Sequence, residues 1–220
     1  MRNHGAALAV FAVALAAVAC GGSEQTVVNQ YFNAVKAKDD QTLSSFAAVR
    51  FDKPIESWKI TNVSEEQRAP VTAGELAAKV KDLEAQLAKN TKDARDTLDA
   101  AKVGEVQALK RQNKPIPASH QATATEYDRF TKASVDLKRQ VATAKDALEK
   151  ERRHMTLSVG AVDNLEGVSG EVVSKTVDLD LTIKDEKPAP YVMTLRKYEL
   201  QREGPRAVSR WVVQDLKPRT

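Results

Sequence analysis

Residues 72–154 constrain the fold of this chain more than any other segment. They are rich in alanine, lysine and acidic residues, and Tyr127 and Phe130 are their only aromatic residues. Apolar residues recur there mostly at alternating steps of three and four, which is typical of a helix with a coiled-coil seam. The first stretch of the seam is Leu76, Val80, Leu83, Leu87, Ala94, Leu98 and Ala101, and the second is Tyr127, Phe130, Ser134, Leu137, Val141, Ala144 and Leu148. The segment is therefore predicted to be an antiparallel coiled-coil hairpin.

Local signals predict where the two helices of this hairpin begin and end. Thr72 and Glu75 have the spacing of a capping box, in which each side chain satisfies a free amide at a helix start. Pro115 and Pro117 predict a break, and Ser119 is the predicted N-cap of the second helix. Arms of about 35 to 40 residues give a rod on the order of 50 to 60 Å long. An alanine-rich seam buries little area, so the rod either stands alone or is completed by partner helices.

The two flanking segments carry the aromatic residues and predict a globular base. One helix is expected to start at Ser23 and a second at Asp39 and Asp40, followed by a strand over 58–63. Further strands are expected near 154–159, 171–184, 191–201 and 206–216, with turns at 185–188 and 203–205. The fold class is therefore predicted as α+β, with two N-terminal helices packed on a curved antiparallel sheet. Residues 20–71 plus 155–220 form this discontinuous domain, and 72–154 form the inserted hairpin.

Two short stretches of the flanks resemble a known family. Residues 28–39 (VNQYFNAVKAKD) resemble the first helix and helix corner of nuclear-transport-factor-2-like domains, and residues 209–216 (SRWVVQDL) resemble their final strand. The resemblance implies a cone in which helices cover the concave face of the sheet. Members of this family join the early strand to the next element briefly, whereas here residues 72–154 intervene.

The first twenty residues predict where in the cell the protein is located. Arg2 is followed by an apolar run over 6–19, which is the length of a signal-peptide core and too short to span a bilayer. The run ends in Ala17-Val18-Ala19-Cys20, which resembles the lipobox of bacterial lipoprotein signal peptides. That resemblance implies removal of residues 1–19 and attachment of diacylglycerol, usually followed by a further acyl chain such as palmitate, at Cys20. The alternative is an ordinary secretory signal that leaves Cys20 as a free thiol.

An acylated Cys20 predicts the location of the protein. Two or three acyl chains hold a protein on a membrane almost permanently. The resemblance thus implies a bacterial cell envelope protein, on the outer membrane in a Gram-negative host because the residue after Cys20 is not aspartate.

The sequence contains no motif that identifies a catalytic or cofactor site. It lacks phosphate-binding, dinucleotide-binding, nucleophile-elbow and zinc-protease motifs, and its histidines do not cluster as metal ligands. We therefore predict no metal, no cofactor and no enzyme activity. The net charge of +4 is not concentrated in a basic face with interleaved aromatic residues, so nucleic-acid binding is not expected either.

Several polar residues are candidate members of a pocket. If Val177, Leu179, Leu181 and Ile183 face the core, Asp178 and Asp180 face water. His154 is interpreted as a cation near a helix C-terminus and His120 as exposed and without a partner. The remaining candidates are Asp215 and Tyr198, together with Trp58 and Trp211, which are interpreted as core anchors.

These observations favour a non-enzymatic, membrane-anchored lipoprotein that acts as an interaction or structural module through the rod. The alternative is a cone that binds or transforms a small ligand in a closed apolar pocket between helix 27–37 and the sheet. A third hypothesis is an assembly in which rods from several copies pack together. The sequence leaves the partner, the ligand and the oligomeric state unassigned.

Overall fold

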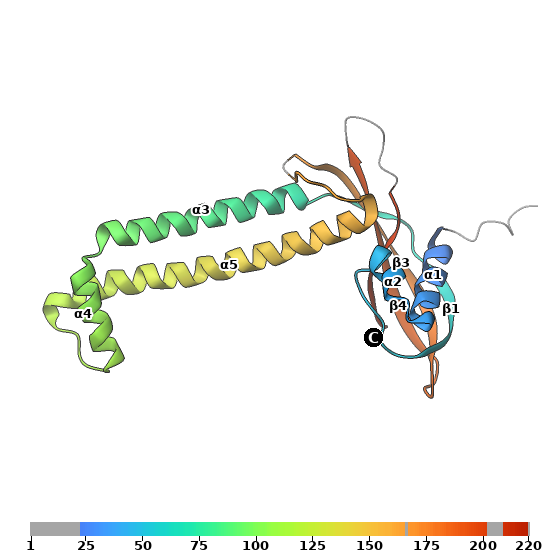
Figure 1. The fold of residues 1–220 in the computed structure, drawn as a ribbon, viewed down its shortest axis with the longest axis horizontal. Coiled ribbons are helices and arrows are strands. Elements are labelled where there is room, and N and C mark those ends of the chain that lie inside the picture. The colour runs from blue at the N-terminus through green and yellow to red at the C-terminus, as the bar shows by residue number, and fades with distance from the viewer. Residues whose placement is uncertain (1–22, 166, 202–208, 220) are drawn as a thin grey trace, which may run out of the picture.

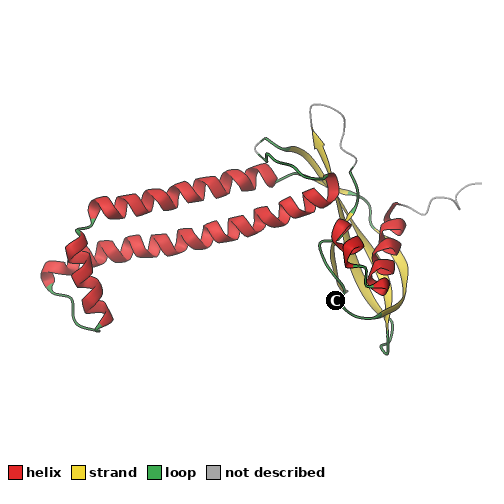
Figure 2. Cartoon of the chain, in the orientation of Figure 1, coloured by secondary structure: helices red, strands yellow, loops and turns green. Residues whose placement is uncertain are grey.

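The computed structural model describes residues 23–165, 167–201 and 209–219, and the elements named below lie in these ranges. The fold is α+β, as predicted, with five α-helices and an antiparallel sheet of five strands. Figure 1 shows a base that holds the sheet and a long helical projection on one side of it. Figure 2 shows that this projection contains helices and loops only.

The sheet has the strand order β1-β3-β4-β5, and the short strand β2 pairs with the other end of β3. The two longest strands form its centre, and all pairs are antiparallel. The bounds are Ile55–Val63 for β1, Gln67–Pro70 for β2, Ser169–Ile183 for β3, Ala189–Gln201 for β4 and Val212–Pro218 for β5. The strand β2 was not among the predicted strands, and its four residues are all exposed. The predicted turn at 203–205 lies outside the described residues.

Two helices, α1 (Ser23–Ala37) and α2 (Asp40–Phe46), cover what we call the inner face of the sheet. Both were predicted, and Asp39 caps α2 as expected, because its carboxylate accepts from the amide of Thr42. The residues of α1 that face the sheet are fully buried, as are most of those they meet on β3 and β4. The core cluster contains Val28, Tyr31, Phe32, Leu43, Phe46, Val177, Leu179, Leu181, Ile183, Met193, Leu195 and Trp211. The predicted inward set on β3 is therefore confirmed.

The outer face of the sheet is covered at one end by the last turns of α5 (Gln121–Val159). Met155 is fully buried there against Val172 and Tyr198. The predicted strand over 154–159 is wrong, because this segment continues the helix. Glu151, Met155 and Ser158 are spaced by four and three residues, so one helical face can bury all of them against the sheet.

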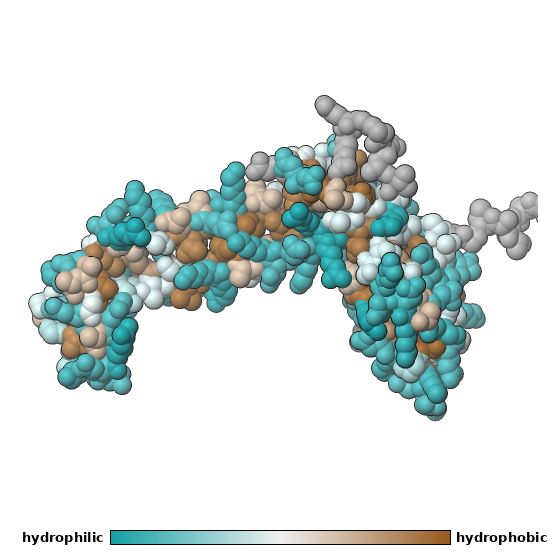
Figure 3. Space-filling view, in the orientation of Figure 1, coloured by the Kyte–Doolittle hydropathy of each residue, from teal (hydrophilic) through white to brown (hydrophobic). Residues whose placement is uncertain are grey.

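The projection consists of α3 (Ala73–Thr97) and α5, which run antiparallel and side by side (Figure 1). Val80 and Leu83 of α3 pack against Val141 and Ala144 of α5. Figure 3 shows apolar residues along the line between the two helices, with polar residues on both sides of it. Asn90 interrupts the apolar seam of α3, and its amide donates to Ser134 Oγ at 2.8 Å. This hydrogen bond explains how a polar residue occupies the seam.

The ends of the helices differ from the prediction. The Thr72 side chain makes no capping hydrogen bond, and Ser119 lies within a short 3₁₀ helix, Ala118–His120, that precedes α5. The first arm is not one helix either, since α3 ends at Thr97 and α4 (Ala100–Arg111) follows. Asp99 causes this break, because its carboxylate accepts from the amides of Ala101 and Lys102 and starts a new helix.

Candidate functional site: the groove between α1 and β1

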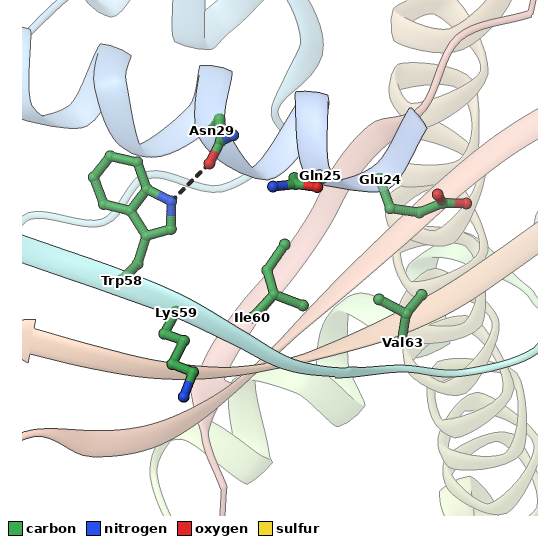
Figure 4. Close-up of a pocket in the computed structure, with 7 residues that line it drawn as sticks. All are labelled: Glu24, Gln25, Asn29, Trp58, Lys59, Ile60 and Val63. Carbon is green, nitrogen blue, oxygen red and sulfur yellow. Dashed lines mark hydrogen bonds between the residues drawn. The ribbon is translucent and has the colours of Figure 1, made fainter. Parts of the chain in front are cut away.

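An open groove of about 660 Å³ lies between α1 and the edge strand β1. Figure 4 shows α1 above the groove and β1 below it. The residues that line it are Glu24, Gln25, Asn29, Trp58, Lys59, Ile60 and Val63. The alternative hypothesis of a ligand-binding cone required a closed apolar pocket between this helix and the sheet. Val28, Tyr31 and Phe32 fill that space and are fully buried, and the groove lies beside it at the edge of the sheet.

The apolar side of the groove comes from β1. Trp58 and Ile60 pair with Leu181 and Leu179 of β3, so both belong to the inner face. A register shift between Ile60 and Asn62 then brings Val63 to the same face, opposite Val177. Strict alternation from Trp58 would have placed Asn62 there, so the sequence did not reveal Val63 as a site residue. We call Trp58, Ile60 and Val63 the apolar rim.

Hydrogen bonding and packing fix the indole of Trp58. Its Nε1–H donates to Asn29 Oδ1 at 2.9 Å, as Figure 4 shows, and its ring lies 5.2 Å from that of Phe32. Lys36 Nζ lies 5.8 Å from the indole centroid and donates to the backbone oxygen of Glu56. Trp58 is thus half-buried, because it packs against the core and also lines the groove. Trp211 is a buried core anchor, as expected.

The groove ends at an ion pair between α1 and the sheet. Glu24 Oε1 lies 2.5 Å from Lys175 Nζ, and both side chains are largely buried. Burial acts to raise the pKa of Glu24, but the hydrogen bond and charge of Lys175 outweigh it and hold that pKa below its usual value. The hydrogen bond to Glu24 in turn raises the pKa of Lys175. Both groups are therefore charged at neutral pH and satisfy each other.

Further charged side chains lie on the inner face beyond the N-terminal end of α1. Arg68 contacts Glu66, Glu171 and Glu199 at 3.1, 2.8 and 3.0 Å. Its hydrogen bonds to these carboxylates, first of all to Glu171, raise the pKa of Arg68. The hydrogen bonds that Glu199 accepts from Lys197 and Arg68 lower the pKa of Glu199. Carboxylates and cations are in direct contact here, which favours their charged, paired forms. This arrangement does not resemble a free general acid or general base.

The first turn of α1 is attached to the sheet at this end. Trp211 Nε1–H donates to Ser23 Oγ at 3.1 Å, and the ammonium groups of Lys175 and Lys197 lie 5.8 and 4.9 Å from the Trp211 ring centroid. These contacts join residues far apart in the sequence, so no local pattern predicted them. They hold the start of α1 in a fixed position on the base.

The four polar residues that the sequence offered as pocket candidates, Asp178, Asp180, Asp215 and Tyr198, lie elsewhere. Asp178 and Asp180 are on the outer face of β3, as expected, and Asp178 contacts Arg219 at 3.2 Å. Asp215 pairs with Thr194 in the sheet and contacts Lys217 at 3.7 Å. Tyr198 is fully buried beneath α5, and burial raises its pKa far above the usual value. The structure brings none of these four residues into the groove.

Both histidine interpretations are wrong. The helix continues past His154 to Val159, and burial together with the charges of Arg196 and Arg153 lowers the pKa of His154, which favours its neutral form. His120 is mostly buried at the tip of the projection, with Nε2 at 2.6 Å from Glu105 Oε2. The fold of α4 against α5 supplies a partner that lies 15 positions away in the sequence.

Neither a metal site nor a membrane span is found in the described ranges. No three or more histidine, cysteine or acidic side chains are grouped there so that they could hold a metal ion. No helix there has the length and apolar character needed to cross a bilayer. The predicted lipid-attachment residue, Cys20, lies outside the described residues.

Comparison of the chain with known protein families, curated proteins and solved structures finds no match. The possible role of the groove is therefore inferred from its own residues and from its place in the fold.

Proposed function

We propose that this protein is a lipoprotein of the bacterial cell envelope, held on the membrane by acyl groups on Cys20, and that it acts through its helical projection as a non-enzymatic interaction or structural module. The end of the apolar run, Ala17-Val18-Ala19-Cys20, is the observation that carries this proposal, and the position of α1 then determines how the base would lie on the membrane. Gly21 and Gly22 alone separate Cys20 from Ser23, and Ser23 and Glu24 are bound to the sheet. The few bonds between Cys20 and Ser23 span about 10 Å at most, so an acylated Cys20 would hold the base close to the bilayer.

The helical projection is suited to reach a partner away from the membrane. α5 has 39 residues, which corresponds to about 58 Å at the rise of an α-helix. We infer that α3 and α5 form an antiparallel coiled-coil hairpin inserted at 72–154. Residues 20–71 plus 155–220 then form a nuclear-transport-factor-2-like cone. The heptad-like spacing of the buried residues Val80, Leu83, Val141 and Ala144 supports the hairpin.

The alternative function, a cone that binds or transforms a small ligand, has one observation in its favour, the groove between α1 and β1. Two observations weigh against it. The interior under α1 is filled by Val28, Tyr31 and Phe32, and Glu24, the acidic residue that lines the groove, is paired with Lys175. A ligand in this groove would lie on the surface of the base. Titration with candidate ligands would then change the indole NMR signal of Trp58 but not that of Trp211.

Cys20→Ala is expected to move the protein from the membrane fraction to the soluble fraction. The variant loses the only thiol of the chain and with it the anchor, and each buried methylene of that anchor contributes about 0.8 kcal/mol. Fractionation and intact mass of the protein from bacterial cells measure this. A wild-type mass that equals the chain from residue 20 with a free thiol would contradict the proposal and support an ordinary secretory signal.

Removal of the projection is expected to abolish partner capture and leave the base folded. The deletion should span residues 78–147, replaced by a short glycine-serine bridge, because Ala73 and Glu151 contact the base and must stay. Crosslinking in cells followed by mass spectrometry of captured proteins gives the result, and tryptophan emission of the base serves as the folding control. Capture of the same proteins by the shortened chain would show that the projection is not the binding element.

A further inference from the structure

The apolar rim of Trp58, Ile60 and Val63 includes an exposed large hydrophobic side chain. Val63 is 40% exposed, and the other exposed large hydrophobic side chain of the described ranges is Val135, on the helical projection. Ile60 and Trp58 are half-buried beside Val63 along one side of the groove. Figure 4 shows Ile60 and Val63 pointing up from β1 toward α1. An exposed valine that continues a strip of half-buried apolar side chains at the edge of a groove is suited to contact with another surface.

The rim also occupies a defined place in the molecule. In Figure 1, α1 and β1 lie on the side of the base away from the helical projection. The groove opens beside Glu24, in the first turn of α1, and Cys20 precedes that turn by only a few residues. A membrane bound through Cys20 would therefore lie next to the rim and not next to the projection.

We propose that the apolar rim rests on the lipid surface of the membrane that holds the anchor. This rests on the proposed acylation of Cys20. The tether of about 10 Å leaves little room for a protein between the bilayer and the start of α1. Trp58 has the amphipathic ring favoured at membrane interfaces, with its N–H satisfied by Asn29. Lys36 places an ammonium group suited to lipid phosphates 5.8 Å from the indole centroid.

A lipid surface fits this rim better than an added protein strand does. β1 is an edge strand, but register shifts between Ile55 and Ser57 and between Ile60 and Asn62 interrupt its regular geometry. Irregularities of this kind on an edge strand oppose pairing with a further strand. Lipid acyl chains need apolar contact and no backbone register. With the rim on the bilayer, the helical projection points away from the membrane.

The test uses the acylated mature protein, which begins at Cys20, in vesicles of phosphatidylethanolamine and phosphatidylglycerol, with or without bromine atoms on the acyl chains. Bromine quenches tryptophan emission on contact, and the chain has only two tryptophans. We expect a loss of emission in wild type that disappears in Trp58→Phe, because Trp211 is buried in the core. Val63→Asp should weaken the quenching, whereas Val135→Asp, the matched change on the projection, should leave it unchanged.

The outcomes separate this inference from the proposed function. Intact mass is measured first, and a chain without acyl groups would overturn both. An acylated protein whose Trp58 emission is not quenched by brominated lipid would overturn the lipid contact while the anchor stands. Protection of Trp58 together with crosslinked dimers or a bound protein would assign the rim to a protein partner and would likewise overturn the inference.

Discussion

Arg196→Met is expected to lower the free energy of unfolding of the base by about 3 kcal/mol, because it leaves Glu151 buried without a partner. The guanidinium of Arg196 contacts Glu151 Oε2 at 3.0 Å, and the two side chains are 17% and 8% exposed. The pair joins β4 to the last turns of α5, so it fixes the root of the projection on the sheet. Urea unfolding followed by tryptophan emission measures the loss, since Trp211 belongs to the core cluster of the base and Trp58 packs against it.

Two further variants make this prediction specific. Arg139→Met removes an ion pair with Asp136 whose side chains are 75% and 42% exposed, and it should cost less than about 0.5 kcal/mol. Glu151→Leu combined with Arg196→Met replaces the buried pair by apolar groups and should return stability to within about 1 kcal/mol of wild type. Equal instability of the single and double variants would show that lost packing, and not the uncompensated charge, is the cause.

Phe32→Ala is expected to have the largest effect on the base, a loss of about 4 kcal/mol from the free energy of unfolding. Phe32 is fully buried, and its ring centroid lies 5.2 Å from those of Tyr31 and Trp58. A domain of this kind has a total stability of about 5 to 15 kcal/mol, so the variant should be partly unfolded at modest urea concentrations. Its Trp58 emission should shift to longer wavelength in the folded state, because a packing partner of the indole is removed.

Phe32→Leu is the matched control, since it keeps an apolar side chain of similar length in the same space. It should cost about 1.5 kcal/mol or less. A loss below about 1 kcal/mol for Phe32→Ala would mean that the space between α1 and the sheet is not tightly packed. That result would revive the hypothesis of a ligand pocket at this position.

Local periodicity predicted most elements of the base and of the projection. The apolar faces of α1 and of β3 repeat at helical and strand spacing, and Val28, Phe32, Val177 and Leu179 are buried as those patterns require. The proline-containing segment between the helices was also predicted, because proline removes a backbone donor wherever it stands. These signals depend on residues at most a few positions apart, which is why the sequence is enough to reveal them.

The same local rules failed where distant residues decide the outcome. The segment 154–159 resembled a strand, but Met155 and Ser158 gain more by burial on the outer face as part of α5. His120 was expected to be exposed, but the return of α4 against α5 places Glu105 beside it. β2 was missed because none of its residues is buried, so its sequence has no apolar alternation.

Local spacing was enough to predict the α+β class, the helical middle and the apolar faces, because the period of a hydrophobic pattern is set by the geometry of a single helix or strand. Which polar groups meet and which apolar groups stay open depends instead on how the elements pack together. Glu24 and Lys175 are 151 positions apart, and Val63 reaches the groove through a register shift that depends on its pairing with β3. Such contacts are absent from local spacing because they arise when separate elements pack, and the candidate site is made of them.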